Sequence, residues 1–251
     1  MKKAFTVFVF LFLLVGCTKT AQEQGAGEAG IESGGGVLAG SGDFEKVSFR
    51  TEDGFTIAAN LWRGGKAVVL LHQFQLDKAS YGSLAAKLAD ANYTVLAIDL
   101  RGHGESLDRN GLKIRHSSFS GQDFRDMAKD VKAAKKYLQQ EGFAMHAIVG
   151  SSIGANTAVN YSAQDASVEK IVLLSPGMEF KGIDAGAQAR SVKAKALIVA
   201  SDDDPYSFTS GQALAKLING AEFMPLRNAG HGTYMFLSTN LEEKIVQWIS
   251  K

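Results

Sequence analysis

The sequence is poor in cysteine and proline, and it has no excess of charge of either sign. Its 251 residues include one cysteine, three prolines, 27 basic and 26 acidic side chains. A single cysteine cannot form an internal disulfide, and the balanced charge gives no basic surplus for binding nucleic acid. The sequence also has neither a Cys/His cluster with metal-ligand spacing nor a phosphate-binding glycine loop. We therefore expect no metal, no organic cofactor and no nucleic-acid partner.

Long hydrophobic runs are absent as well. The N-terminal apolar segment, residues 4–15, is shorter than the roughly 20 apolar residues that a transmembrane helix needs. A basic start, a short apolar segment and a small-residue cleavage site are typical of a secretory signal. Residues 14–17 also resemble a bacterial lipobox, which predicts a lipoprotein signal peptide over 1–16 and lipidation of Cys17. A cleaved secretory protein or a signal anchor is the alternative.

The segment that follows contains few residues that could form a core. Residues 17–42 have eight glycines after position 24 and almost no large apolar side chains, so burial cannot offset the entropy of ordering them. We expect a flexible tether that joins the lipidated Cys17 to one folded domain, residues 43–251. The expected location is the bacterial cell envelope, with the membrane as a partner through the lipid and the domain facing the periplasm or the exterior.

Strand and helix patterns alternate along the folded part. This alternation predicts an α/β fold with a mostly parallel eight-stranded sheet flanked by helices. Ligands of such sheets bind at the carboxyl ends of the strands, so a candidate site residue should directly follow a strand. The expected strands are 45–51 and 55–62, which form a hairpin, then 67–72, 93–100, 146–151, 170–175, 195–201 and 222–227. The expected helices are 78–92, 121–141, 153–163, 207–219 and 240–250.

The segment GSSIG, residues 150–154, fits the pattern G-x-S-x-G between an expected strand and an expected helix. Small residues on both sides of a sharp turn let the backbone pass close to its neighbours. The turn then holds Ser152 outward at the helix N-terminus, where the helix dipole favours negative charge. We interpret Ser152 as a nucleophile. The alternative is that Ser151 or Ser152 only caps the helix, as serine often does.

A serine nucleophile needs a base, and the base needs an orienting acid. His231 in RNAGHG follows the last expected strand and is the preferred base, although His103 also follows a strand. The acids of ASDDDPY follow the strand 195–201, and among them Asp204 directly precedes a proline that fixes the next turn. Asp204 is the preferred acid, and Asp203 is the alternative.

The order Ser152, Asp204, His231 resembles the α/β-hydrolase superfamily. The resemblance covers residues 45–251 and includes LLHQF (70–74) and DLRGHGES (99–106). Only about twenty residues separate the sixth and seventh expected strands, which leaves no room for a large cap domain. The chain is therefore similar to capless, dienelactone-hydrolase-like or esterase-like members of the superfamily, exported as a lipoprotein.

The resemblance implies an oxyanion hole made by the backbone amides of Phe74 and Ile153. Gln73 stands where the family usually has glycine, which leaves the donor role of Phe74 open. The resemblance also implies an open site whose substrate selectivity depends on loop side chains. We expect Phe74 and Tyr206 to bind substrate. The further candidates for lining the site are Phe119, Met178 and Met235.

These features predict a serine hydrolase that cleaves small carboxylic esters through a Ser152–His231–Asp204 triad and an acyl-enzyme intermediate. A thioesterase, a lysophospholipase or a peptidase would use the same residues, and the fold does not distinguish them. A non-catalytic envelope lipoprotein that binds a ligand is the alternative from another class.

Overall fold

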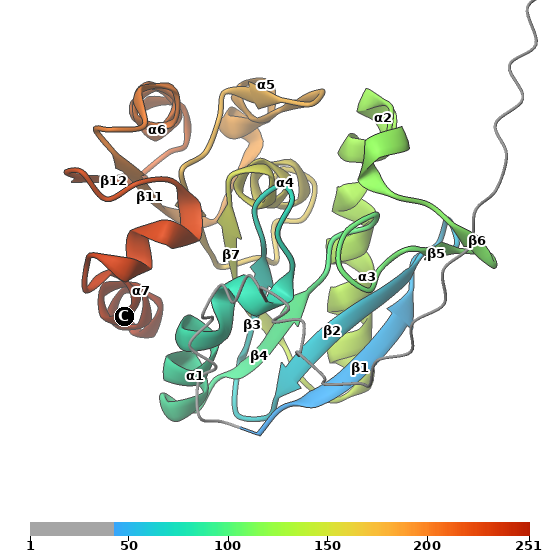
Figure 1. Ribbon diagram of the computed structural model, residues 1–251. Coiled ribbons are helices and arrows are strands. Elements are labelled where there is room, and N and C mark those ends of the chain that lie inside the picture. The colour runs from blue at the N-terminus through green and yellow to red at the C-terminus, as the bar shows by residue number, and fades with distance from the viewer. Residues whose placement is uncertain (1–42) are drawn as a thin grey trace, which may run out of the picture. The chain divides into compact units, whose positions relative to one another are not determined.

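Eight strands of the described chain form one sheet in the order β1-β2-β4-β3-β7-β8-β11-β12 (Figure 1). This computed structural model describes residues 43–251, so the predicted signal peptide, Cys17 and the tether lie outside the described residues. β2 is antiparallel to β1 and β4, and all other neighbours in this sheet are parallel. The predicted α/β fold with a mostly parallel eight-stranded sheet is therefore confirmed. The strands are β1 Glu45–Arg50, β2 Thr56–Trp62, β3 Ala67–Leu71, β4 Thr94–Ile98, β7 Met145–Ser151, β8 Lys170–Leu174, β11 Lys195–Ser201 and β12 Glu222–Leu226.

Burial along the strands explains their place in the sheet. All residues of β3, β4, β7 and β8 are buried, as continuous apolar strands are when helices cover both faces of a parallel sheet. β1 and β12 lie at the two ends of the strand order and are only partly buried. Within residues 43–251, continuous apolar runs thus form the centre of the sheet.

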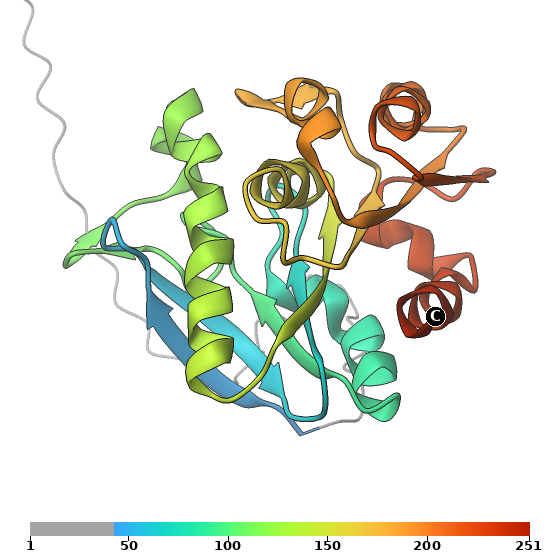
Figure 2. The same cartoon turned by 180° about the vertical axis from the view of Figure 1, so that it is seen from behind.

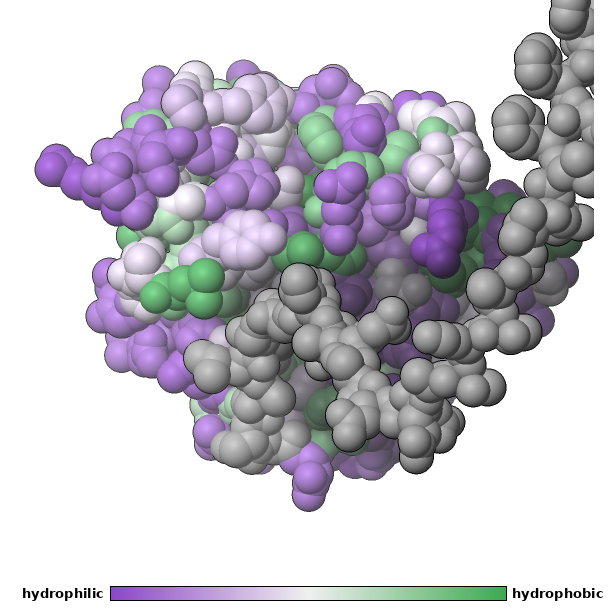
Figure 3. Space-filling model, in the orientation of Figure 1, coloured by the Kyte–Doolittle hydropathy of each residue, from purple (hydrophilic) through white to green (hydrophobic). Residues whose placement is uncertain are grey.

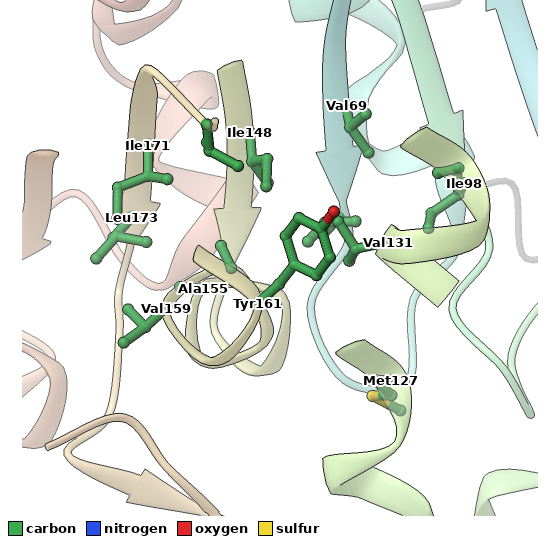
Figure 4. Close-up of a cluster of buried hydrophobic side chains, with 14 of the residues drawn as sticks. Val69, Ile98, Met127, Val131, Ile148, Ala155, Val159, Tyr161, Ile171 and Leu173 are labelled. Atoms are coloured by element: carbon green, nitrogen blue, oxygen red, sulfur yellow. The ribbon is translucent and has the colours of Figure 1, made fainter. Parts of the chain in front are cut away.

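Helices cover both faces of the sheet (Figures 1 and 2). Alternate residues of β3 point to opposite sides: Val68 and Leu70 pack with α1 and α7, whereas Val69 and Leu71 pack with α3, α4 and α6. Figure 4 shows part of the core between the sheet and helices α3, α4 and α6, where Val131 of α3 and Val159 of α4 lie with sheet residues such as Ile148. The helices are α1 Gly82–Asp90, α2 Gly121–Arg125, α3 Met127–Gln140, α4 Ile153–Ser162, α5 Ala185–Gln188, α6 Pro205–Leu217 and α7 Leu241–Ser250.

Segments between the main strands differ in detail from the expected pattern. The helix expected over 121–141 is interrupted at Asp126, whose ψ of −7° separates α2 from α3. The segment between β8 and β11 contains a two-stranded hairpin, β9 Glu179–Phe180 and β10 Ile183–Asp184, followed by the short α5. This segment adds no cap domain, and it places the hairpin over α4, with which β10 and β9 are in contact.

Hydrophobic residues are scattered over the visible face of the domain (Figure 3). On the face shown in Figure 3, hydrophilic residues surround small separate hydrophobic patches. Large hydrophobic side chains that are exposed in the described residues are Phe44, Leu112, Tyr206, Tyr234 and Leu237. No helix within residues 43–251 has the length and apolar character needed to cross a bilayer.

The sheet has a switch point between β3 and β7. From β3 the strand order continues to β4 on one side and to β7, β8 and β11 on the other. Ligands of open α/β sheets bind outside the carboxyl ends of the strands at such a point. Here the end of β3 is followed by residues 72–74 and the end of β7 by Ser152.

Candidate active site

The chain turns sharply at Ser152, between β7 and α4. Ser152 has φ 51° and ψ −113°, a left-handed conformation that is uncommon for a residue with a side chain. The flanking glycines are required by close contacts. A Cβ on Gly150 would lie 2.3 Å from the carbonyl oxygen of Gly154, and a Cβ on Gly154 would lie 2.2 Å from that of Leu71. The G-x-S-x-G pattern therefore allows β7, α4 and β3 to meet at this turn.

The two serines of this turn differ in accessibility and bonding. Ser151 is fully buried and donates from Oγ to Oε1 of Gln73 at 3.0 Å. Ser152 is half-buried and lines a pocket, and its side chain does not cap α4. The alternative that one of these serines caps the helix with its side chain is therefore wrong for both. Ser152 alone presents its hydroxyl to the pocket.

Asp204 and His231 are paired across two loops. Asp204 follows β11 and precedes Pro205, the first residue of α6, and its Oδ2 lies 2.6 Å from Nδ1 of His231. A carboxylate at Nδ1 fixes the tautomer with the proton on that atom, which leaves Nε2 able to accept a proton. The His231 side chain is 40% exposed and that of Asp204 is 19% exposed. A bound molecule can therefore reach the imidazole, while the carboxylate is largely enclosed.

The other two acids of this loop support the histidine loop. Asp202 accepts a hydrogen bond from the backbone amide of Asn228, and Asp203 accepts from that of Gly230 and from the hydroxyl of Ser201. These bonds hold the chain just before His231. The three acids thus have separate contacts, and Asp204 is the one that reaches the imidazole.

Gln73 joins three loops of the site. Its Oε1 accepts hydrogen bonds from Ser151 Oγ at 3.0 Å, from the Thr233 backbone amide at 2.9 Å and from the Thr233 hydroxyl at 3.3 Å. A Cβ on Gly232 would lie 2.0 Å from this oxygen, so only glycine fits there. Ser175 accepts from the Gly232 amide at 2.9 Å. The serine turn, the loop after β3 and the histidine loop are therefore fixed to one another.

The two amides expected to form an oxyanion hole are available for an acceptor. No side chain caps α4, whose first residue is Ile153. The Phe74 amide has no backbone or side-chain acceptor within residues 43–251. The substitution of glycine by Gln73 therefore leaves the amide of the next residue free.

These residues surround one pocket with a volume of about 270 Å³. Of the residues expected to line the site, Phe74 and Tyr206 do so. Phe119, Met178 and Met235 are not part of its wall, and Met235 is fully buried in the core on the α1 and α7 side. The lining residues are Gln73, Phe74, Ser152, Asn156, Ser175, Gly177, Phe180, Asp204, Tyr206, Ser207 and His231.

The sequence did not single out several of these lining residues as site residues. Ser175 directly follows β8, so the rule that site residues follow a strand also applies to it. Asn156 lies one helical turn after Ser152, on the same side of α4. Its side chain accepts from the Gly177 amide and donates to the Ile183 carbonyl, which ties the β9–β10 hairpin to α4. Phe180 gave no signal in the sequence, because its position depends on that hairpin.

The other histidines do not line this pocket. His72 bonds to the Gln73 carbonyl through Nδ1 and accepts the Leu100 amide at Nε2. His103 bonds to the Arg101 carbonyl, and burial lowers its pKa from 6.5 to about 4. His103 was the alternative base from the sequence. It does not line the pocket, and its ring is bonded to a backbone carbonyl rather than to a carboxylate.

Within residues 43–251 no group of three or more His, Cys, Asp or Glu side chains is arranged to hold a metal ion. The groups of the site able to take part in chemistry are thus the Ser152 hydroxyl, the Asp204–His231 pair and the free backbone amides. This combination is suited to attack by a hydroxyl on a carbonyl carbon with stabilisation of the oxygen.

Known proteins share the sequence pattern over part of their length. The chain is 30% identical over 128 residues to the AB hydrolase superfamily protein YisY of Bacillus subtilis, which is 50% of this chain and 43% of that protein. It is 27% identical over 139 residues to the uncharacterized protein Rv2715 of Mycobacterium tuberculosis, which is 55% of this chain and 37% of that protein. The chain thus spans less than half the length of these relatives.

Solved structures share the fold over most of the chain. An esterase from Exiguobacterium antarcticum matches with a TM-score of 0.69 and 15% identity over 82% of this chain and 100% of that one. The esterase RhEst1 from Rhodococcus sp. ECU1013 matches with a TM-score of 0.65 and 20% identity, over 82% of this chain and 98% of that one. A dienelactone hydrolase from Anabaena variabilis matches with a TM-score of 0.63 and 15% identity, over 83% of this chain and 95% of that one.

Residues 65–228 match the Hydrolase_4 family, described as serine aminopeptidase, S33. This span includes the serine turn and the acidic loop and ends just before the histidine. The sheet order and the sharp strand–serine–helix turn agree with that match. The chain belongs to the Hydrolase_4 family of α/β-hydrolases.

Proposed function

We propose that this protein is a serine esterase that hydrolyses small carboxylic esters through Ser152, His231 and Asp204. The observation that carries the proposal is the 2.6 Å pair of His231 and Asp204 in the same pocket as the outward-facing Ser152. The esterases among the structural neighbours share the fold and support the reaction class by analogy. The pocket volume of about 270 Å³ favours a short acyl group.

In the proposed mechanism, Ser152 Oγ attacks the ester carbonyl carbon while His231 Nε2 takes the hydroxyl proton. Asp204 holds the imidazole and stabilises its cation. The carbonyl oxygen, now negative, accepts hydrogen bonds from the amides of Phe74 and Ile153. His231 then gives its proton to the leaving alcohol, which leaves an acyl group on Ser152. Water, activated by the same imidazole, hydrolyses this acyl-enzyme and regenerates the serine.

Ser152 Oγ has no hydrogen-bond partner within residues 43–251. Hydrogen bonds between a nucleophile and its base are often long in the absence of substrate and become shorter when substrate binds. The proposal therefore requires Ser152 Oγ and His231 Nε2 to approach each other in the complex.

The test is hydrolysis of p-nitrophenyl esters, from acetate to palmitate, by the purified full chain and by Ser152→Ala. We expect the variant to lose at least about a thousandfold in kcat, because the nucleophile is gone. A matched variant, Ser151→Ala, should retain most of the activity. A fluorophosphonate should label the wild-type protein and not Ser152→Ala. Without hydrolysis and without labelling, the non-catalytic binding lipoprotein becomes the better hypothesis.

The second candidate function is a peptidase, which the description of the matched family favours. A peptidase would use the same nucleophile and base, so the substrate distinguishes the two candidates. Aminoacyl p-nitroanilides are the matched probes, because their leaving group is close in shape to p-nitrophenol. Cleavage of these amides with a higher kcat/KM than that of the esters would replace the esterase proposal. The same comparison with acyl thioesters and lysophospholipids tests the thioesterase and the lysophospholipase.

We further propose that the domain is held at the bacterial envelope by a lipid on Cys17. The proposal rests on the lipobox-like sequence, since residues 1–42 lie outside the described part of the chain. Labelled palmitate should be incorporated by cells that express the full chain and not by cells that express Cys17→Ser. Equal incorporation in both would contradict lipidation at this residue.

A further inference from the structure

A lysine lies at the tip of the β9–β10 hairpin in a conformation that favours other residues. Lys181 has φ 53° and Gly182 has φ 86°. Two consecutive left-handed residues characterise a type I′ hairpin turn, in which asparagine or glycine is usual at the first position. A lysine is uncommon in this backbone conformation.

The ammonium group of Lys181 lies over a cluster of three phenylalanine rings. The distances from Nζ to the ring centroids are 4.8 Å for Phe74, 5.5 Å for Phe124 and 5.7 Å for Phe180. The ring of Phe74 packs edge to face on the other two, with centroid distances of 6.1 and 5.9 Å. Cation–π attraction to these faces holds the side chain in place. Phe74 and Phe180 also line the pocket, so two of the three rings beneath the ammonium belong to the pocket wall.

This cation has no carboxylate partner within residues 43–251. Glu179, on the same hairpin, accepts the Gly182 amide with Oε1 at 2.5 Å. Arg125 donates to the Gly182 carbonyl at 3.3 Å, and its other donors bind Gln122, so a second positive charge without a carboxylate lies beside the turn. The positive charge also reaches His116, whose pKa is lowered first by burial and then by Lys181.

The turn itself is fixed in position. Asn156 of α4 bonds to the Ile183 carbonyl of β10 and the Gly177 amide before β9, and the Tyr206 hydroxyl donates to the Glu179 carbonyl. Three pocket-side contacts therefore hold the hairpin that carries Lys181. A side chain that is already held in place at a binding site loses less conformational entropy when a ligand binds than a mobile side chain does.

We propose that Lys181, caged by Phe74, Phe124 and Phe180, is a subsite for a carboxylate on the acyl part of the substrate, so that the protein prefers half-esters of short dicarboxylic acids. Aromatic faces attract the ammonium but offer it no strong hydrogen-bond acceptor, and a carboxylate supplies one. The inference rests on the proposed esterase function and names its substrate class.

The test compares two esters that differ in one charge: the p-nitrophenyl half-ester of glutaric acid and its methyl-capped neutral diester. Rates are corrected for the uncatalysed reaction, and kcat/KM is measured for both. We expect the wild-type ratio of acidic to neutral ester to exceed that of Lys181→Met by about two- to fivefold, as for an exposed ion pair. Lys181→Arg should restore most of the ratio, and Lys181→Glu should lower it further.

The matched control is Lys193→Met. Lys193 is exposed and precedes β11, so it lies near the amino end of that strand, whereas the pocket lies at the carboxyl ends of the strands. Its removal should leave the ratio at the wild-type value. Added salt should lower the wild-type ratio, because salt screens partly exposed charges. A ratio equal in wild type and Lys181→Met would overturn the carboxylate subsite. Hydrolysis of neither ester would instead count against the esterase proposal, so the two failures are distinguishable.

Discussion

His231 on one side, and His72 and His103 on the other, all follow strands of the same sheet but have opposite environments. His231 pairs with the carboxylate of Asp204 and is 40% exposed in the pocket. His72 and His103 are buried and bond to backbone carbonyl groups, and burial lowers the pKa of both. His103 also stacks on His116 with a centroid distance of 4.3 Å.

The difference shows what a histidine needs to act as a base. A base in the proposed reaction needs a carboxylate beside the imidazole and access to the substrate, and His231 has Asp204 at its Nδ1 and lines the pocket. For His72 and His103 the cation would have to form in a buried site, which desolvation disfavours. Position after a strand is therefore common to both groups, whereas the partner and the access to solvent separate them.

The largest expected effect comes from breaking the His231 side of this comparison with Asp204→Asn. The amide would leave the imidazole without its negative partner and favour the wrong tautomer, so kcat should fall about a thousandfold or more. The measurement is kcat for p-nitrophenyl acetate at pH 7.5. Asp203→Asn is the matched control, since Asp203 bonds to Gly230 and Ser201, and it should lose far less. The reverse order of losses would make Asp203 the acid.

A smaller loss is expected from Gln73→Met, because Gln73 follows His72 in the chain and is bonded to Thr233 of the histidine loop. The change removes the acceptor for Ser151 and Thr233, so the histidine loop can shift, and kcat should fall about 10- to 100-fold. Gln73→Glu keeps an acceptor at this place and should recover part of the rate. The comparison of kcat with KM identifies the effect, since a positioning role lowers kcat more than it raises KM. Wild-type kinetics in Gln73→Met would show that these bonds are not needed.

The smallest effect on hydrolysis is expected at His103, where stability is the property that should change. Its folded-state pKa of about 4 lies below the ordinary 6.5, so between these values the unfolded chain binds more protons. The stability contributed by the neutral imidazole is present above pH 6.5 and is lost as the pH falls towards 4, by about 3 kcal/mol.

This expectation is checked by urea unfolding at pH 7, 6, 5 and 4 for wild type and His103→Phe. The phenylalanine cannot take up a proton, so the free energy of unfolding should fall less steeply with acid in the variant. Carboxylates contribute to both proteins equally, and the difference between the two curves isolates His103. Parallel curves would mean that His103 does not titrate differently in the two states.

The fold was predictable because its main signals are local. Apolar runs such as residues 67–71 and 170–174 identify buried parallel strands by themselves. The break at Asp126 and the β9–β10 hairpin were missed, because both depend on a few polar residues and on packing against α4 rather than on periodicity. The first residues of the helix expected over 78–92 form a separate 3₁₀ helix, Lys78–Tyr81, capped by Asp77 and followed by α1, a detail that periodicity does not show.

The candidate site was predictable in part. The serine turn, the acid before proline and the histidine between glycines each follow a strand, and the structure brings them to one pocket. Their catalytic roles stay predictions until the variants are measured. The pocket wall was predicted less well, since Phe74 and Tyr206 line it but Phe119 does not, and Phe180 came from a hairpin that the sequence did not reveal.

The sequence by itself determined the order of strands and helices and the residues that stand at strand ends, because both follow from neighbours a few positions away. Only the tertiary structure decided which of the acids reaches His231, where Gln73 places its oxygen and which rings surround Lys181. Gln73 and Thr233 are 160 positions apart, and Lys181 and Phe74 come from separate loops. Such contacts exist only once the sheet has brought the ends of its strands together, and no local pattern encodes them.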